Sequence, residues 1–358
     1  MTNPPAERKI LVNAARVGDS GGLQAFTAAL LRCVAKMPGT RVAAVVGGDD
    51  ELPAGVERVR APAGIAMLGH SAWLRSLRGY LYARRLAREY RDWRVISTTH
   101  LGLPGHRRQI LTVHDLRPRA MPDSWVQSLY FHWMLPRELQ CADGVLTVSE
   151  TSKAAIAQTY GVALENIYVV PNSVRTFQPA AMREERPYLL MVNATYRHKN
   201  AGEVLEHHAL WAARYRLKIL AGEGSYRDGL KTQVQRLGLG ERVDFLSPVT
   251  DEELAALYTH AAALVYPSLM EGFGLPPAEA MAYGTPVIVS DIPVFHEVLG
   301  DAPLFVRLGD TASWKQALDG IDAARTPERV ALGRNIAGQY TQERMCAALN
   351  NALRIIWG

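Results

Sequence analysis

The sequence predicts an α/β protein built from two doubly wound domains in series. The chain has 358 residues, a length that fits two domains of common size. Short runs rich in apolar and β-branched residues recur along it, and segments of helical periodicity follow them. Strands that are apolar almost throughout are typical of a parallel sheet covered by helices on both faces.

The expected elements alternate along the chain. Strands are expected at residues 9–14, 41–47, 94–99, 109–115, 144–150, 167–173, 188–194, 216–222, 242–247, 262–268 and 285–291, and helices at 23–37, 151–161, 229–240 and 251–261. Residues 171–187 are rich in proline and charge without periodicity, so we place the domain boundary near Pro179. The domains are then 1–179 and 180–358, and the amphipathic segment 342–358 is expected to pack back on the first.

Composition limits the classes of partner that the protein is expected to bind. The hydrophobic content of 48% and charged content of 21% are ordinary for a globular protein, while a net charge of +5 favours anionic partners such as nucleotides, diphosphates or a phospholipid surface. No feature points to nucleic acid. No run reaches the roughly 18 apolar residues of a membrane span, so any membrane contact is expected to be peripheral.

The number and spacing of the cysteines indicate the redox environment of the protein. Cys33, Cys141 and Cys346 are odd in number, widely scattered and without metal-ligand spacing. This pattern predicts neither a disulfide framework nor a zinc site. A reducing cytoplasm fits it, and the N-terminal residues lack the apolar run of a secretory signal.

The loop at residues 268–284 is the strongest candidate site. It joins an apolar strand to a helix, and in parallel sheets ligands bind at the carboxyl ends of strands. Glu271 is expected at the strand end of the loop and Glu279 in the first helical turn, while Gly272 and Gly274 let amide groups turn toward an anion. Two carboxylates there would repel a phosphate unless both accept hydrogen bonds from hydroxyls, as a sugar nucleotide offers. Alternatively, Glu279 complements the helix dipole and Glu271 is a solvated loop charge.

Three other segments follow expected strands. Lys199 and Arg197 come after residues 188–194, where they can neutralise a diphosphate or form an exposed basic turn. His114 ends another strand and either contacts a substrate hydroxyl or is a satisfied turn histidine. Gly21 and Gly22 would place amides at the start of a helix, near phosphates or the acceptor.

Residues 271–291, EGFGLPPAEAMAYGTPVIVSD, resemble the donor-site signature of retaining GT-B glycosyltransferases of the glycogen-synthase-like and mannosyltransferase-like family, group 1 of family four. Further matching pieces lie at 19–26, 112–119 and 197–200, in the family's order. The resemblance implies two Rossmann-like domains facing each other across a cleft, with the acceptor on the first and the nucleotide sugar on the second. Many members have glycine where Asn193 stands and arginine where His198 stands.

The resemblance also implies residue roles. Glu279 would hold the ribose diol, Glu271 the donor sugar, and Lys199 the diphosphate. Arg197 and Asn193 would also belong to the donor site, although they match the family pattern less closely. His114 would contact the sugar from the first domain. The amides of Gly272, Phe273, Gly274 and Leu275 would bind donor sugar and phosphate.

The implied reaction is retaining transfer of a hexose from a nucleotide sugar to a hydroxyl of a glycan or a polyprenyl-diphosphate-linked glycan, in surface polysaccharide synthesis. The overall pattern is similar to O-antigen and exopolysaccharide mannosyltransferases, which favours GDP-mannose or a GDP-deoxyhexose. UDP and dTDP sugars remain open, as does a non-catalytic nucleotide-sugar-binding protein. No Asp-x-Asp pair occurs, so neither a metal nor a cofactor is expected, and the full glycine fingerprint of an NAD enzyme is missing.

The first domain carries many arginines between Arg75 and Arg119, interleaved with aromatic residues. This pattern suits a surface that rests on anionic lipid of the inner membrane, or solvated arginines with aromatic stems packed inside. A helical stripe in residues 125–139 is expected to be core rather than membrane contact. It consists of Val126, Leu129, Tyr130, Trp133 and Met134.

Overall fold

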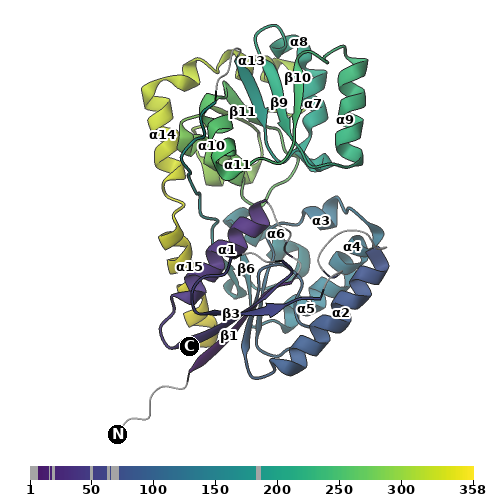
Figure 1. Cartoon of the computed structure of the whole chain (residues 1–358), viewed down its shortest axis with the longest axis vertical. Helices are drawn as coiled ribbons and strands as arrows, with labels where there is room; N and C mark the ends of the chain where they lie inside the picture. Colours follow the sequence, from purple (N-terminus) through teal and green to yellow (C-terminus); the bar gives the residue numbers. More distant parts are fainter. Residues whose placement is uncertain are drawn as a thin grey trace. The chain divides into compact units, whose positions relative to one another are not determined.

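The structure is a computed structural model that describes residues 7–15, 17, 21–48, 51–62, 65, 72–182 and 187–358, without the side chains of 72–76. The chain divides into two compact units, residues 1–173 with 342–358, and residues 174–341 (Figure 1). The division falls after Ser173, earlier than the expected boundary near Pro179. The reason is local: the amide of Val174 donates to the carbonyl of Tyr340, and that of Phe177 to the Tyr283 hydroxyl, so this segment belongs to the second unit.

The first unit is organised around a seven-stranded parallel sheet of order β3-β2-β1-β4-β5-β6-β7. Its strands are β1 (Arg8–Ala14), β2 (Thr40–Val46), β3 (Val56–Arg60), β4 (Arg94–Ser97), β5 (Gln109–Thr112), β6 (Gly144–Thr147) and β7 (Ile167–Val169). Strands β5 and β6 are buried throughout and β4 is buried after Arg94, as the apolar runs predict. Edge strand β3 was not predicted, because its sequence VERVR is largely charged and only partly buried.

Helices cover this sheet. They are α1 (Gly22–Ala35), α2 (Ala72–Glu89), α3 (Arg117–Ala120), α4 (Trp125–Leu129), a π-helical turn η1 (Tyr130–Met134), α5 (Leu135–Cys141), α6 (Glu150–Tyr160), the 3₁₀ turn η2 (Leu164–Asn166) and α15 (Gln342–Trp357). Helix α6 begins at an N-cap, since the Ser149 hydroxyl accepts from the amide of Ser152, and it ends at Gly161 in the left-handed region.

Helix α15, the last segment of the chain, belongs to the first unit and packs on α1. A disulfide joins Cys33 of α1 to Cys346 of α15, and Gln342 donates to the carbonyl of Ala29 at 2.9 Å. At the other end of the helix, the Trp357 indole donates to Asp143 at 2.8 Å. The expectation of no disulfide is therefore wrong. A pair 313 residues apart becomes adjacent only because the chain returns to its first unit.

Removing this disulfide should destabilise the first unit in oxidised protein only. We expect Cys346→Ser to lower the free energy of unfolding by about 2–5 kcal/mol, because a closed loop restricts the unfolded chain. Thermal unfolding with and without dithiothreitol measures the effect. The wild type should lose stability on reduction while Cys346→Ser should not respond, and Cys141→Ser, which changes the free cysteine, serves as the matched control. Equal melting of wild type and Cys346→Ser without reductant would contradict the link.

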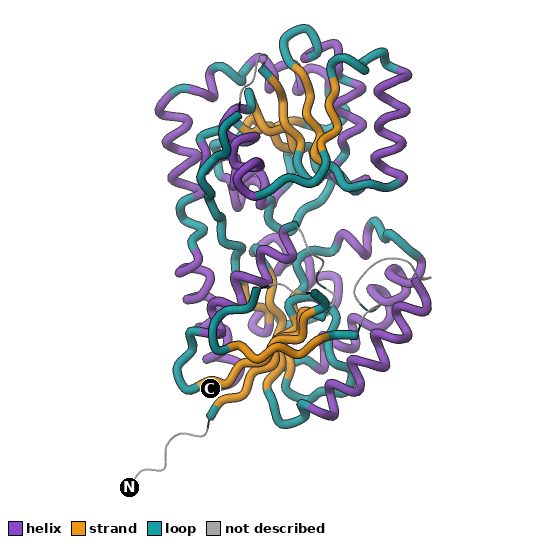
Figure 2. The backbone as a smooth tube through the Cα atoms, viewed as in Figure 1, coloured by secondary structure: helices purple, strands orange, loops and turns teal. Residues whose placement is uncertain are grey.

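The second unit contains a six-stranded parallel sheet of order β10-β9-β8-β11-β12-β13. Its strands are β8 (Tyr188–Met191), β9 (Arg216–Leu220), β10 (Val243–Leu246), β11 (Ala263–Tyr266), β12 (Val287–Ser290) and β13 (Leu304–Val306). Its helices are α7 (Ala201–Glu206), α8 (His208–Trp211), α9 (Ser225–Arg236), α10 (Asp251–His260), α11 (Leu275–Tyr283), α12 (Pro293–Leu299), α13 (Thr311–Asp319) and α14 (Pro327–Ala337), with 3₁₀ turns η3 (Arg197–Lys199) and η4 (Ala323–Arg325). Figure 2 shows loops leaving the ends of these strands.

Candidate active site

Two loops of the second unit bring Lys199 and Glu271 together. One loop follows β8 and the other follows β11, the central pair of strands, so both start from the carboxyl edge of the sheet. The amide of Leu269 donates to the carbonyl of His198 at 2.8 Å and joins the loops. The Lys199 ammonium then reaches the Glu271 carboxylate at 2.5 Å and the Tyr266 hydroxyl at the same distance.

This ion pair is largely withdrawn from water, because each side chain is only 11% exposed. Burial alone would raise the pKa of Glu271, but the charge and the hydrogen bond of Lys199 hold it below its usual value. Glu271 is therefore ionised at neutral pH. It is not the solvated loop charge of the alternative interpretation.

Glu279 lies in the second turn of α11, since this helix begins at Leu275. The expectation of a first-turn position is wrong, and a helix-dipole role is weakened accordingly. Its carboxylate accepts a hydrogen bond of 3.0 Å from the Tyr258 hydroxyl. Burial raises the pKa of Glu279 to about 7, against the lowering effects of that bond and of Arg175. This carboxyl group consequently titrates near neutral pH.

The glycine-containing turn between these glutamates has one left-handed position. Gly274 has a φ of 94°, and a Cβ there would lie 2.7 Å from the Phe295 ring, so the position requires glycine. Phe273 is buried, and its ring packs edge-on against that of Tyr340 with 5.0 Å between the ring centroids. Helix α11 starts with Leu275, Pro276 and Pro277. The prolines carry no N–H, so the amides at this end belong to the turn and Leu275.

The other residues predicted on the β8 loop are at the surface. Asn193 is exposed and left-handed, with a φ of 57°. Glycine takes this conformation most easily and asparagine is enriched among the rest, which explains how asparagine replaces the glycine of the resembling family. Arg197 is exposed in η3, beside the buried ring of His198.

In the first unit, His114 and the glycine pair lie near the same helix. His114 follows β5, and its Nε2 donates to the carbonyl of Thr98, which follows β4, at 2.9 Å. Burial lowers its pKa, so the ring is neutral at pH 7 with Nδ1 as an acceptor. The ring packs edge-on against Phe26 of α1 at 4.7 Å. Gly21, with a φ of 92°, caps α1 and Gly22 is its first residue.

Two tyrosines of the second unit were missed by sequence reasoning. Tyr266 ends β11 and contacts Lys199, and the charges of both Glu271 and Glu279 raise its pKa after the larger effect of burial. Tyr258 of α10 faces Glu279. For Tyr266 the sequence did contain a signal, because this tyrosine ends the otherwise apolar run ALVY directly before the loop. Nearby, Thr250 and Glu253 form a capping box at the start of α10.

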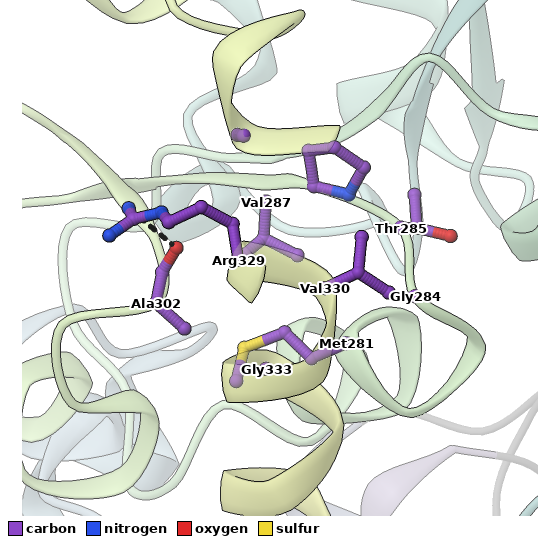
Figure 3. Close-up of a pocket in the computed structure, with 10 residues that line it drawn as sticks. Met281, Gly284, Thr285, Val287, Ala302, Arg329, Val330 and Gly333 are labelled. Carbon is purple, nitrogen blue, oxygen red and sulfur yellow. Dashed lines mark hydrogen bonds between the residues drawn. The ribbon is translucent and has the colours of Figure 1, made fainter. Parts of the chain in front are cut away.

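A small cavity lies elsewhere on α11, against α14 (Figure 3). Its volume is about 10 Å³, and Met281, Val330 and Gly333 line it. Arg329 crosses it to donate to the carbonyl of Ala302 at 3.3 Å. A cavity of this size holds about one water molecule and no sugar nucleotide.

Comparisons with known proteins identify the family of the chain. Residues 174–335 match the family described as Glycosyl transferases group 1, and residues 20–177 match Glycosyltransferase Family 4. The chain is 36% identical over 351 residues to the O-antigen chain mannosyltransferase RfbU of Salmonella typhimurium, covering 96% of this chain and 99% of the relative. It is 31% identical over 305 residues to the O-antigen chain mannosyltransferase B of Escherichia coli, covering 77% and 78%.

A solved structure shows the fold. The sucrose-phosphate synthase of Thermosynechococcus elongatus superposes with a TM-score of 0.77 at 20% identity, covering 98% of this chain and 99% of that one. The predicted fold class is thus confirmed, with two parallel sheets in two Rossmann-like units. The chain belongs to the group 1, family 4 glycosyltransferases and has their GT-B fold.

Proposed function

We propose that this glycosyltransferase transfers mannose, with retention of configuration, from GDP-mannose or a related GDP-deoxyhexose to a hydroxyl of an O-antigen glycan or its polyprenyl-diphosphate-linked precursor. The names of the two relatives support the sugar and the product class. The observation that carries the proposal is the mostly buried Lys199–Glu271 pair at the carboxyl edge of the sheet, where α/β proteins bind their ligands.

Lys199 is suited to the diphosphate. Its ammonium has three N–H donors, of which Tyr266 and Glu271 accept two, so one remains for a phosphate oxygen. Both contacts fix the ammonium before the donor arrives. A cation that is already positioned needs no reorganisation when negative charge develops on the leaving group.

The proposed step breaks the bond between the anomeric carbon and the phosphate oxygen. The acceptor oxygen bonds to the same face of that carbon, and its proton passes to the departing phosphate oxygen. Lys199 offsets the charge of the released GDP, and no protein nucleophile is needed. Glu271 orients the donor sugar and supports its developing positive charge, since the carboxylate is ionised.

Further contacts complete the proposed donor site. Glu279 accepts hydrogen bonds from the ribose diol, and the amides of Gly272, Phe273, Gly274 and Leu275 bind donor sugar and phosphate. His114 accepts a hydrogen bond from a sugar hydroxyl through Nδ1. Arg197 and Asn193 flank the phosphates, and the amides at Gly21 and Gly22 face phosphate or acceptor.

The proposal includes no metal or cofactor, because Lys199 supplies the charge that a metal would otherwise bring. It places the protein in the cytoplasm, with peripheral contact to the inner membrane, where the acceptor would be lipid-linked. In a reducing cytoplasm Cys33 and Cys346 would be thiols, so the disulfide gives no support to this location.

Ligand-dependent unfolding tests the donor. We expect GDP to raise the free energy of unfolding by about 2.7 kcal/mol at 100 times its Kd, with UDP, dTDP and NAD weaker, because only the folded state binds. Thermal shifts in parallel titrations give the order. Selective stabilisation by UDP or dTDP would refute the GDP donor, and stabilisation by NAD alone would refute the glycosyltransferase site. Product from GDP-mannose with inverted configuration would refute retention.

A further inference from the structure

The first unit carries an exposed apolar surface that its core does not need. On the segment from α4 to α5, Trp125 is 68% exposed and Trp133 is 62% exposed, and Leu129 between them is also exposed. They follow each other at intervals of four residues, which places them in one row along the helix. Of the stripe that was expected to be core, Leu129, Trp133 and Met134 are exposed, so the expectation is wrong for them. Tyr130 of the same stripe is partly buried and packs against the core. The core is formed instead by the opposite row, which includes Phe131 and Leu135.

Helix α2 packs against α4 (Figure 1) and carries a second exposed row. Leu77 and Leu81 are exposed on α2, and the same row continues with the exposed Arg84 and Arg88. Soluble proteins rarely expose apolar side chains of this size in contiguous rows without a partner. We call the surface formed by Leu77, Leu81, Arg84, Arg88, Trp125, Leu129 and Trp133 the α2–α4 face.

The charge on the α2–α4 face is positive. Helix α2 contains five arginines and a single acid, Glu89, which pairs with Arg85 at 3.8 Å. Arg137 continues the tryptophan row on α5, where it donates to the carbonyl of Trp133 at 2.7 Å. A second copy of the chain would bring like charges together across a two-fold axis, which disfavours self-association through this face.

The combination of tryptophan, leucine and arginine on the α2–α4 face favours one class of binding partner. Tryptophan partitions to the boundary between headgroups and acyl chains, leucine enters the apolar layer, and arginine pairs with phosphate. No described helix is long and apolar enough to cross a membrane. We propose that the α2–α4 face docks the protein onto the surface of a bilayer that contains anionic phospholipid. This names the surface for the membrane contact in the proposed function, without depending on which sugar is transferred.

Flotation of the full chain with vesicles tests this face without any donor or acceptor. We expect binding to vesicles of phosphatidylethanolamine with phosphatidylglycerol, and at least about tenfold weaker binding to phosphatidylcholine. Trp125→Ser with Trp133→Ser, and separately Arg84→Glu with Arg88→Glu, should each weaken anionic binding by about tenfold or more. Salt should weaken the remaining binding of the tryptophan variant more than that of the arginine variant.

Matched controls lie in the same unit, away from this face. Leu164→Ser changes an exposed apolar residue of η2, and Arg344→Glu with Arg354→Glu makes the same charge change at exposed positions of α15, which lies across the unit from α2 (Figure 1). Both should bind like wild type, and all variants should melt like wild type. The assignment would be overturned if control and test variants lost binding equally, or if wild type bound both kinds of vesicle alike. It would also be overturned if the test variants lost an oligomeric state but still bound lipid. If variants of the α2–α4 face keep the thermal shift caused by GDP, their loss of lipid binding is independent of the donor site.

Discussion

Replacing Lys199 with methionine should lower sugar transfer by about 10²–10³-fold, because one positioned donor to the leaving group has an effect of that size. It should also destabilise the second unit by about 3–5 kcal/mol, since Glu271 would stay buried without its cation. Transfer from the nucleotide sugar and chemical unfolding at pH 8 measure the two effects. Loss of activity and loss of stability have different origins here, so they can be separated.

The double variant Lys199→Met with Glu271→Gln makes that separation. It removes both charges, so stability at pH 8 should return toward wild type while transfer should not. Removing a whole buried pair is often nearly neutral, whereas removing one partner is not. If the double variant regains transfer, or if Lys199→Met alone transfers at the wild-type rate, the proposed role of the lysine is wrong.

The dependence on pH gives an independent check. In wild type the pKa of Glu271 lies below its unfolded value, so its contribution to stability is present above about pH 4.5 and is lost as pH falls through the lowered pKa. In Lys199→Met burial is no longer opposed by the ammonium, and the pKa should rise above 4.5. The Lys199→Met penalty should therefore grow between about pH 5 and pH 8 and shrink in acid.

The order of strands and helices was predictable because each inner strand is a short apolar run. Parallel strands then place every following loop at one edge, so the neighbourhood of Lys199 and Glu271 was accessible to reasoning from sequence. What periodicity cannot show is which row of a short helix meets the sheet. Trp133 and Phe131 lie on one segment, yet only Phe131 is buried.

Contacts between segments far apart in the sequence could not be predicted from it either. Nothing local indicates that Cys33 meets Cys346, or that Tyr258 of α10 faces Glu279 of α11. The position of Glu279 depended on the first residue of α11, and the helix begins at Leu275, before the two prolines, so Glu279 lies beyond its first turn. These errors share one cause, since each needs tertiary packing that a pattern along the chain does not record.

Donor affinity should depend on the protonation of Glu279. Its pKa of about 7 means that the carboxylate, the form that accepts hydrogen bonds from a ribose diol, gains population between pH 6 and pH 8. We expect GDP-mannose to bind about tenfold more tightly at pH 8 than at pH 6. Isothermal titration with GDP-mannose is the suitable measurement, because its diphosphate has no ionisation near neutral pH. Glu279→Gln should bind about 10–100-fold more weakly at pH 8 and lose the pH dependence.

Tyr258 should set the position of this transition. Its hydroxyl donates to Glu279 and so favours the charged form, as Arg175 does, while Asp251 favours the neutral form. Tyr258→Phe removes the donor, so the pKa of Glu279 should rise and the gain in affinity should move above pH 7. Tyr188→Phe is the matched control, since it removes a buried hydroxyl that donates to the carbonyl of Leu257 instead. A purely structural effect of Tyr258 would weaken binding equally at all pH values, and that outcome, or an equal shift in the control, would contradict the role of Glu279. The direction of the shift also discriminates: because the bond stabilises the ionised carboxylate, its loss can only move the transition upward.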